Sequence, residues 1–405
     1  MAPSKIQRGT PAYRRITFAM LLAGLATFGA FYCVQPLLPL FSQLFGVNAE
    51  EASLTVSITI GPMAFALLAA GMVSDRVGRR PLMIASLLLA AVFTLLCAAA
   101  QTWAMLLALR LLVGVTLAGV PAVAMAYIVE EVDDPSVSHA MGVYIGGTAM
   151  GGLAGRLLGG IITDFAGWRV ALAVVGGFML ITALAFWRSA PPSAHFAPRP
   201  VSPRAYAQGM KRLFSDRAIP LLFAESFLLM GAFVALYNYV GFRLAAPPYN
   251  LGPALVSAIF LLYLLGSFSS TFAGSLAGRH GPRRILWIAL AIFLAGIAIT
   301  LRAPLPLVVF GVAVVTIGFF GAHAVASAWV GRRARADRAQ ASAFYLFFYY
   351  MGGGILGSIG GFAWTHGGWP GVAAFTGGLI ALAVLIGMRL ARILPLPPES
   401  GGPAR

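Results

Sequence analysis

The ten residues GMVSDRVGRR, from Gly71 to Arg80, form a short polar and basic segment between two long apolar runs. A related segment, GSLAGRHGPRR, occupies 274–284 and again separates two apolar runs. A second pair, DFAGWRVALAVVGG at 164–177 and THGGWPGVAAFTGG at 365–378, recurs at almost the same offset. Repetition at this spacing indicates a chain built from two related halves.

The composition indicates that most of the surface lies in lipid. Of the 405 residues, 60% are hydrophobic and only 10% are charged. A spanning helix needs about 20 mostly apolar residues. Twelve segments qualify, and they begin near Ile16, Ala52, Pro81, Trp103, Ser138, Trp168, Ala218, Pro253, Ile285, Leu305, Ala341 and Val372. The sequence therefore predicts an all-α polytopic membrane protein with twelve transmembrane helices in two pseudo-symmetric six-helix halves.

The polar segments divide the chain and orient it. We expect an N-terminal tail at 1–15, a first half at 16–188, a linker at 189–217, a second half at 218–392 and a C-terminal tail at 393–405. An even number of spans places both termini on one side. The loop bases, except Arg169, Arg243 and Arg302, fall on that same side. Because cytoplasmic loops carry the excess of Lys and Arg, both termini are predicted to be cytoplasmic.

Several function classes are disfavoured by the same pattern. The net charge is +16, but the bases lie in short loops and form no basic face of the kind that binds nucleic acid. The two cysteines, Cys33 and Cys97, lie inside apolar runs and give no metal-binding spacing. No nucleophile, base and orienting group occur with recognisable spacing, and no phosphate-binding loop is present. We therefore predict no enzyme activity, no metal and no cofactor, and an ion or substrate gradient as the energy source.

The segment at 71–80 resembles the loop 2–3 signature of the major facilitator superfamily, and the helix count, linker and repeats extend the resemblance over almost the whole chain. The matching positions are Gly71, Asp75, Arg76, Gly78, Arg79 and Arg80. The resemblance implies that Asp75 is held by nearby bases and the amino end of helix 11, and that the inward-open state breaks this lock. Close helix packing is expected at Gly71. In the second copy Gly278 replaces the acid, so only the first half can carry the lock. Alternatively, Arg79 and Arg80 only enforce topology.

Two further segments support the same family. LALRLLVGVTLAG resembles its Arg-x-x-x-Gly signature through Arg110 and Gly114. GGTAMGGLAGRLLGG resembles the Gly-rich motif of proton-coupled exporters, with Arg156 where that motif has proline. Four glycines of this segment share one helical face, which lets another helix approach closely or slide: Gly147, Gly151, Gly155 and Gly159. Simple tight packing is the alternative. The resemblance points to the twelve-helix drug and sugar efflux permeases.

One acid is predicted to lie inside the membrane. All twelve acidic residues except Glu225 fall in loops, tails or helix ends. Glu225 on helix 7 and His323 on helix 10 both lie about 10 Å inside the cytoplasmic boundary, by helix rise. They could meet and form a proton relay, since helices 1, 4, 7 and 10 line the cavity in the family. The alternatives are that Glu225 anchors backbone and that His323 is an ordinary interior histidine.

A second polar layer is predicted about 10 Å inside the periplasmic boundary. It comprises Gln35, Arg110, Arg156, Tyr237 and Asn238. Two arginines without an acid at their level need carbonyls, amides or an anionic ligand. We therefore expect these residues to contact an anionic or carbonyl-rich substrate. The alternative is that either arginine binds backbone carbonyls as a structural clamp.

These expectations together describe a transporter of the bacterial inner membrane that works by alternating access. The favoured function is proton-coupled efflux, by antiport, of a drug- or sugar-like compound. One alternative is an uptake symporter or uniporter for a small organic anion, with Glu225 only structural. A protein of transporter fold that acts as a sensor or assembly partner is the alternative from another class. The expected partners are a small-molecule substrate, protons and the lipid bilayer. A monomer is expected because each chain contains both halves.

Overall fold

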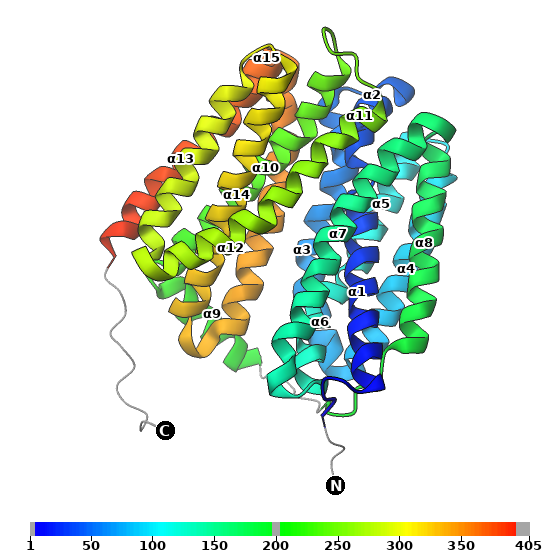
Figure 1. The fold of residues 1–405 in the computed structure, drawn as a ribbon, viewed down its shortest axis with the longest axis vertical. Helices are drawn as coiled ribbons and strands as arrows, with labels where there is room; N and C mark the ends of the chain where they lie inside the picture. The colour runs from blue at the N-terminus through cyan, green and yellow to red at the C-terminus, as the bar shows by residue number, and fades with distance from the viewer. Residues whose placement is uncertain (1–4, 197–202, 394–405) are drawn as a thin grey trace.

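A computed structural model of the chain describes residues 5–196 and 203–393, and nearly all of them are helical (Figure 1). The first half comprises α1 (Pro11–Tyr32), η1 (Gln35–Leu37), α2 (Leu38–Phe45), α3 (Ala49–Val77), α4 (Arg79–Ala98), α5 (Trp103–Leu117), α6 (Gly119–Glu131), α7 (Asp134–Ala166) and α8 (Trp168–Ser189). The second half comprises α10 (Ile219–Ala245), α11 (Pro253–Ala258), η2 (Ile259–Leu262), α12 (Tyr263–His280), α13 (Pro282–Thr300), α14 (Leu305–Arg333), η3 (Arg335–Asp337) and α15 (Arg338–Arg392). Between the halves lies α9 (Pro203–Ser215).

These helices confirm the predicted fold of twelve spans. In the described residues, 11 helical stretches are long and apolar enough to cross a membrane. The last of them, α15, is 55 residues long and contains two spans, because Gly368 has non-helical backbone angles of φ 55° and ψ −146°. The first, fourth and eighth spans are each assembled from shorter helices in sequence. The first span begins at Pro11, earlier than expected, because Thr10 caps its amino end.

The sequence repeats correspond to matched turns in the two halves. Gly78 connects the second and third spans with a φ of 92°, and Gly281 connects the eighth and ninth with a φ of 86°. Gly167 and Gly368 form the other matched pair, with φ of 83° and 55°. Residues with side chains rarely adopt such angles, so the glycines recur where each half needs the same sharp turn.

The two halves converge at one end of the bundle and diverge at the other (Figure 1). We call the end near the two chain termini the tail end, and the opposite end the far end. At the far end Ser53 of α3 donates a hydrogen bond to Ser358 of α15 over 3.3 Å. The backbone N–H of Ala254 donates to the carboxylate of Asp164 over 3.0 Å, which joins α11 to α7. These contacts close the far end in this conformation.

The segment predicted as a linker divides between the halves. Its described beginning packs on the first half, where Arg80 donates to the carbonyl of Ala190 over 2.9 Å. Its helix α9 pairs with the second half through Arg212 and Asp337, 2.7 Å apart. Polar composition alone did not indicate this helix, whose ends are held by partners distant in the sequence.

Candidate functional site

Arg156 is a buried cation at the junction of the halves. It lies on α7 and is only 2% exposed. Its Nε donates to Gln35 Oε1 over 2.7 Å and its Nη1 to the carbonyl of Gly152 over 2.7 Å. Three ring centroids surround the guanidinium carbon, at 3.8 Å for Tyr32, 4.9 Å for Phe260 and 4.6 Å for Tyr263. No carboxylate pairs with Arg156 in the part of the chain that the structure describes. Aromatic faces favour a cation without neutralising it, so the site keeps a net positive charge.

Gln35 links Arg156 to the other half. Its Nε2 donates to Oδ1 of Asn238 on α10 over 2.9 Å. Asn238 is completely buried, and its Nδ2 has no hydrogen-bond partner among the described residues. A buried amide donor without a partner is costly, by about 1–3 kcal/mol. Asn238 therefore offers a buried donor beside an unneutralised cation, an arrangement suited to acceptor oxygens on a ligand.

The neighbouring Tyr237 faces a different environment. Its hydroxyl bonds to Thr316 Oγ1 on α14 over 2.7 Å, and its ring centroid lies 4.8 Å from that of Tyr263. Tyr237 therefore packs against Tyr263, one of the rings around Arg156. Its hydroxyl is hydrogen-bonded to Thr316.

The second arginine of the predicted polar layer donates its hydrogen bonds to backbone carbonyls. Arg110 on α5 donates from Nε to the carbonyl of Thr55 over 3.1 Å. Its Nη1 and Nη2 donate to the carbonyls of Ala30 and Phe31 over 3.0 and 2.7 Å. The side chain has no exposed surface. These contacts tie α5 to α3 and α1, as the clamp alternative described, and they leave no free edge for a ligand.

Replacement of Arg110 by Gln should therefore lower stability more than substrate affinity. The shorter amide leaves buried carbonyls without donors, at a cost of about 2–5 kcal/mol. We expect a clear drop in the thermal unfolding temperature of the purified protein. Arg169→Gln, which removes an exposed arginine stacked on Trp168, is the matched control and should unfold near the wild-type temperature. Normal unfolding of the Arg110 variant, together with weakened substrate binding, would contradict the clamp assignment.

Glu225 lies in the part of α10 nearest the tail end. It has no exposed surface, and neither carboxyl oxygen has a hydrogen-bond partner among the described residues. An ionised carboxylate in such a place is strongly unfavourable unless a cation or donor compensates it. The geometry therefore accommodates the neutral acid in this conformation.

His323 does not hydrogen-bond to Glu225. Its Nδ1 instead lies 3.1 Å from the hydroxyl of Tyr345 on α15. The imidazole also stacks parallel to Phe319, at 6.0 Å between centroids, and lies 4.7 Å from Tyr349. The helix-depth count placed the two residues at one level but could not give the direction in which each faces around its helix.

Aromatic rings connect the two polar layers. The ring centroid of Tyr349 lies 5.3 Å from that of Tyr350, and the centroid of Tyr350 lies 6.3 Å from that of Phe31 in the first half. Phe31 lies 4.6 Å from Tyr32, which stacks on Arg156. Contact between α1 and α15 brings them together.

The residues of the loop 2–3 signature form a charged cluster at the tail end. Arg79 pairs with Asp75 over 2.7 Å and with Glu130 of α6 over 3.2 Å. Arg80 donates to the carbonyls of Trp187 and Ala190 over 2.7 and 2.9 Å. Arg76 points outward and is exposed. Glu130 is 51 residues from Arg79 in the sequence, and only the fold brings the two together.

Close packing at Gly71 is not present in this conformation, contrary to our expectation. Apart from its chain neighbours and the adjacent backbone of α3, no atom of the described residues lies within 4 Å of the position that a Cβ would occupy there. The diverging tail ends remove any neighbour from this face of α3.

The helix-packing glycines of α7 lie directly against α1. A Cβ at any of them would come too close to a backbone oxygen of α1 or of its C-cap Cys33, at 2.5 Å for Gly147, 2.2 Å for Gly151, 2.1 Å for Gly155 and, against Cys33, 2.3 Å for Gly159. Only glycine permits this approach. It also positions Arg156, on the same helix, beside Tyr32.

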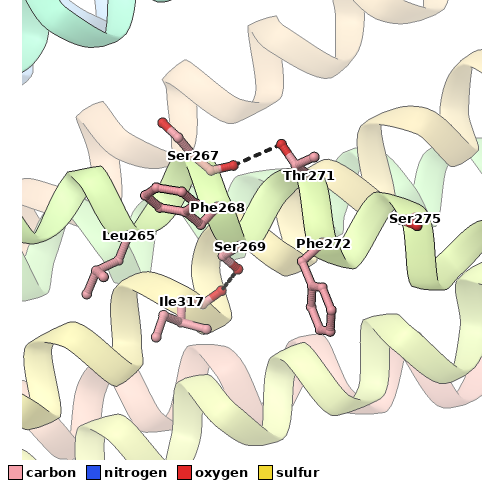
Figure 2. Close-up of a pocket in the computed structure, with 8 residues that line it drawn as sticks. All are labelled: Leu265, Ser267, Phe268, Ser269, Thr271, Phe272, Ser275 and Ile317. Carbon is pink, nitrogen blue, oxygen red and sulfur yellow. Dashed lines mark hydrogen bonds between the residues drawn. The ribbon is translucent and has the colours of Figure 1, made fainter.

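An open hollow lies elsewhere, on the second half. A space of about 770 Å³ lies along α12 and is lined by Leu265, Ser267, Phe268, Ser269, Thr271, Phe272, Ser275 and Ile317 (Figure 2). Ser269 donates to the carbonyl of Ile317 over 2.6 Å, and Phe268 is 76% exposed. The lining carries no charge and comes only from the second half. This hollow is therefore distinct from the candidate site at Arg156.

Comparison with known proteins agrees with this architecture. The model of the Major Facilitator Superfamily matches residues 20–266 and 228–405. The chain is 44% identical over 389 residues to the inner membrane transport protein YnfM of Escherichia coli, covering 96% of this chain and 93% of the relative. It is 41% identical over 392 residues to the uncharacterized MFS-type transporter YybF of Bacillus subtilis, covering 97% of each.

A solved structure shares the fold at low sequence identity. A bacterial homologue of the human lysosomal transporter Spinster, in an inward-facing and occupied conformation, superposes with a TM-score of 0.76 at 15% identity. The match covers 95% of this chain and 97% of that one.

Proposed function

The chain belongs to the Major Facilitator Superfamily of secondary transporters for small molecules, and we propose that it exports its substrate in exchange for protons. The substrate is a drug- or sugar-like compound with acceptor oxygens. Export proceeds by alternating access of the two halves around Arg156 and Asn238. The membrane is the bacterial inner membrane, as the name of the E. coli relative suggests.

The loop bases support an orientation for this mechanism. Bases gather at the tail end, so that end is assigned to the cytoplasm. The far end, closed by the Ser53–Ser358 and Asp164–Ala254 contacts, then faces the periplasm. The described conformation is accordingly the inward-facing state. In it, the pairing of Asp75 with Arg79 remains within the first half.

The burial of Glu225 without a partner is the observation that carries the proton-coupling proposal. In the inward-facing state the carboxyl is held as the neutral acid. When α10 and α15 move, water or substrate reaches the Glu225 carboxyl. The carboxyl then releases its proton. Tyr345, whose carbonyl accepts a hydrogen bond from Ser226 beside Glu225, forms with His323 a polar pair through which such a proton can pass.

Arg156, Gln35 and Asn238 are proposed as the substrate contacts. Gln35 and Arg156 belong to the first half and Asn238 to the second. A ligand bound to them can therefore stay at the junction of the halves while the conformation changes. Arg110 is proposed as a structural clamp and not as a substrate contact, which its three hydrogen bonds to backbone carbonyls support.

The unneutralised charge of Arg156 favours a second candidate function. A small organic anion would satisfy the guanidinium and the Asn238 amide together. In that case the protein is an uptake symporter or a uniporter for the anion, and Glu225 is structural.

Proton movement in proteoliposomes with an entrapped pH dye separates these functions. Panels of cationic drugs, sugars and organic anions should include one compound whose flux opposes a proton flux. Substrate flux in the same direction as protons, or without any proton signal, would contradict antiport and support the anion alternative. A complete lack of flux with every class would support a role as sensor or assembly partner.

A cross-link at the far end tests alternating access itself. Ser53→Cys with Ser358→Cys, in a background with Cys33→Ala and Cys97→Ala, should oxidise readily, because the two hydroxyl oxygens lie 3.3 Å apart. Oxidation should stop transport and reduction should restore it, because the periplasmic side can no longer open.

Two comparisons make the cross-link decisive. The background without either introduced cysteine should be insensitive to the oxidant. Transport that continues at the normal rate through the fully cross-linked protein would show that the far end does not open during the cycle.

A further inference from the structure

A second cationic site lies at the tail end of the first half, away from the transport site. A hollow of about 570 Å³ opens between the beginnings of α1 and α4 and the end of α8. It is lined by Thr10, Pro11, Ala12, Arg15, Arg80, Arg188, Ser189, Ala190, Pro191 and Pro192. We call it the arginine pocket, after its three guanidinium groups.

The pocket carries positive charge with no acid to balance it. Among the described residues, no carboxylate forms an ion pair with Arg15, Arg80 or Arg188. Arg80 is fixed by its bonds to the carbonyls of Trp187 and Ala190. Arg15 and Arg188 are exposed. Like charges are therefore brought together where they repel, unless an anion lies between them.

The neighbouring surface is apolar and faces outward. Phe18, on α1 one turn from Arg15, is 51% exposed, and Trp187, next to Arg188, is also 51% exposed. Tryptophan is enriched at the level of the lipid headgroups. The arginines thus lie where the hydrocarbon-facing surface of three spans meets the tail-end face of the bundle.

We propose that the arginine pocket binds the phosphate of an anionic phospholipid, with the acyl chains along Phe18 and Trp187. Basic pockets between transmembrane helices are suited to anionic headgroups, and guanidinium groups bind phosphate through paired hydrogen bonds. Topology alone requires bases on this face, but it does not require three of them around one hollow. The bound lipid links the first, third and sixth spans at the membrane surface.

Titration of the full-length protein in detergent with phosphatidylglycerol or phosphatidylcholine, followed by native mass spectrometry, tests the proposal. Wild type should bind phosphatidylglycerol more tightly. Arg15→Gln with Arg188→Gln should weaken that binding roughly 10- to 30-fold. The matched control, Arg14→Gln with Arg217→Gln, removes two exposed bases of the same face that do not line the pocket. It should bind like wild type.

Other outcomes have defined meanings. Equal loss in both double variants, or no loss in either, would overturn the proposal, because the pocket would then have no special role. Displacement of the lipid by millimolar inorganic phosphate or glycerol phosphate would assign the pocket to a free anion instead. Arg15→Lys with Arg188→Lys keeps both charges and should retain most of the binding. It also provides a folded variant if the glutamine variant is unstable.

Discussion

Glu225→Gln is expected to abolish proton-driven transport, with a fall in initial rate of at least about 100-fold, as for the loss of an essential proton-transferring group. Glutamine has nearly the shape of the neutral acid but cannot release a proton. The buried position therefore stays filled, and the helices can still alternate. Downhill counterflow of substrate should consequently persist and lose its dependence on the pH gradient. Both rates are measurable in the same proteoliposomes.

Glu131→Gln is the matched control for this prediction. Glu131 is the other deeply buried carboxylate among the described residues, 1% exposed, but it lies at the tail end and pairs with His195 over 3.0 Å. Its replacement should leave proton-driven transport within a few-fold of wild type, since it lies outside the proposed relay. Equal losses in the two variants, or normal proton coupling in the Glu225 variant, would remove Glu225 from the mechanism.

Arg156→Gln is expected to raise the half-saturating substrate concentration by about 10- to 150-fold, the value of one strong charge-assisted hydrogen bond. The charge beside Asn238 would be lost, while Gln35 could still bond to the shorter amide. Arg156→Lys should recover only part of the affinity, because an ammonium group lacks the planar fork of the guanidinium and stacks less well on Tyr32. Concentration-dependent uptake into inverted vesicles gives both values.

Arg169→Gln again provides the control. Arg169 stacks on Trp168 with 4.3 Å between the guanidinium carbon and the ring centroid, but it is exposed and lies apart from the junction of the halves. Its loss should change the half-saturating concentration less than about threefold, since an exposed cation–π contact contributes little. An unchanged affinity in the Arg156 variant would restrict Arg156 to a structural role.

The fold could be predicted from the sequence because its two main signals are local and repeated. Uncharged runs of spanning length define each helix, and glycines at matched positions define the turns, as Gly78 and Gly281 show. The two spans within α15 were separated in the sequence by the same Gly-Trp pair that follows the fifth span, Gly368-Trp369 against Gly167-Trp168. Lipid as the solvent makes these signals stronger than in a water-soluble protein.

The candidate site was only partly predictable. Counting residues along each helix correctly grouped Gln35, Arg156 and Asn238, because a common depth and a polar character bring such side chains together. The same count grouped Glu225 with His323, which do not hydrogen-bond. Depth gives one coordinate of a side chain, whereas contact also depends on helix rotation and crossing angle.

Partners that come from backbone or from distant segments could not be predicted. The three carbonyls bound by Arg110 become available where α1 and α3 pass α5, and no sequence pattern marks them. Likewise, Glu131 and His195 are 64 residues apart and meet only because the beginning of the linker folds back on the first half.

Release of protons on substrate binding tests the central claim most directly. Purified protein in weakly buffered detergent solution is mixed with the compound identified in the proteoliposome panel, and the pH is recorded. If substrate and proton exclude each other, wild type should release about one proton per chain and Glu225→Gln none, by the reciprocity of linked equilibria. Binding without proton release from wild type, or equal release from both proteins, would contradict proton exchange at Glu225.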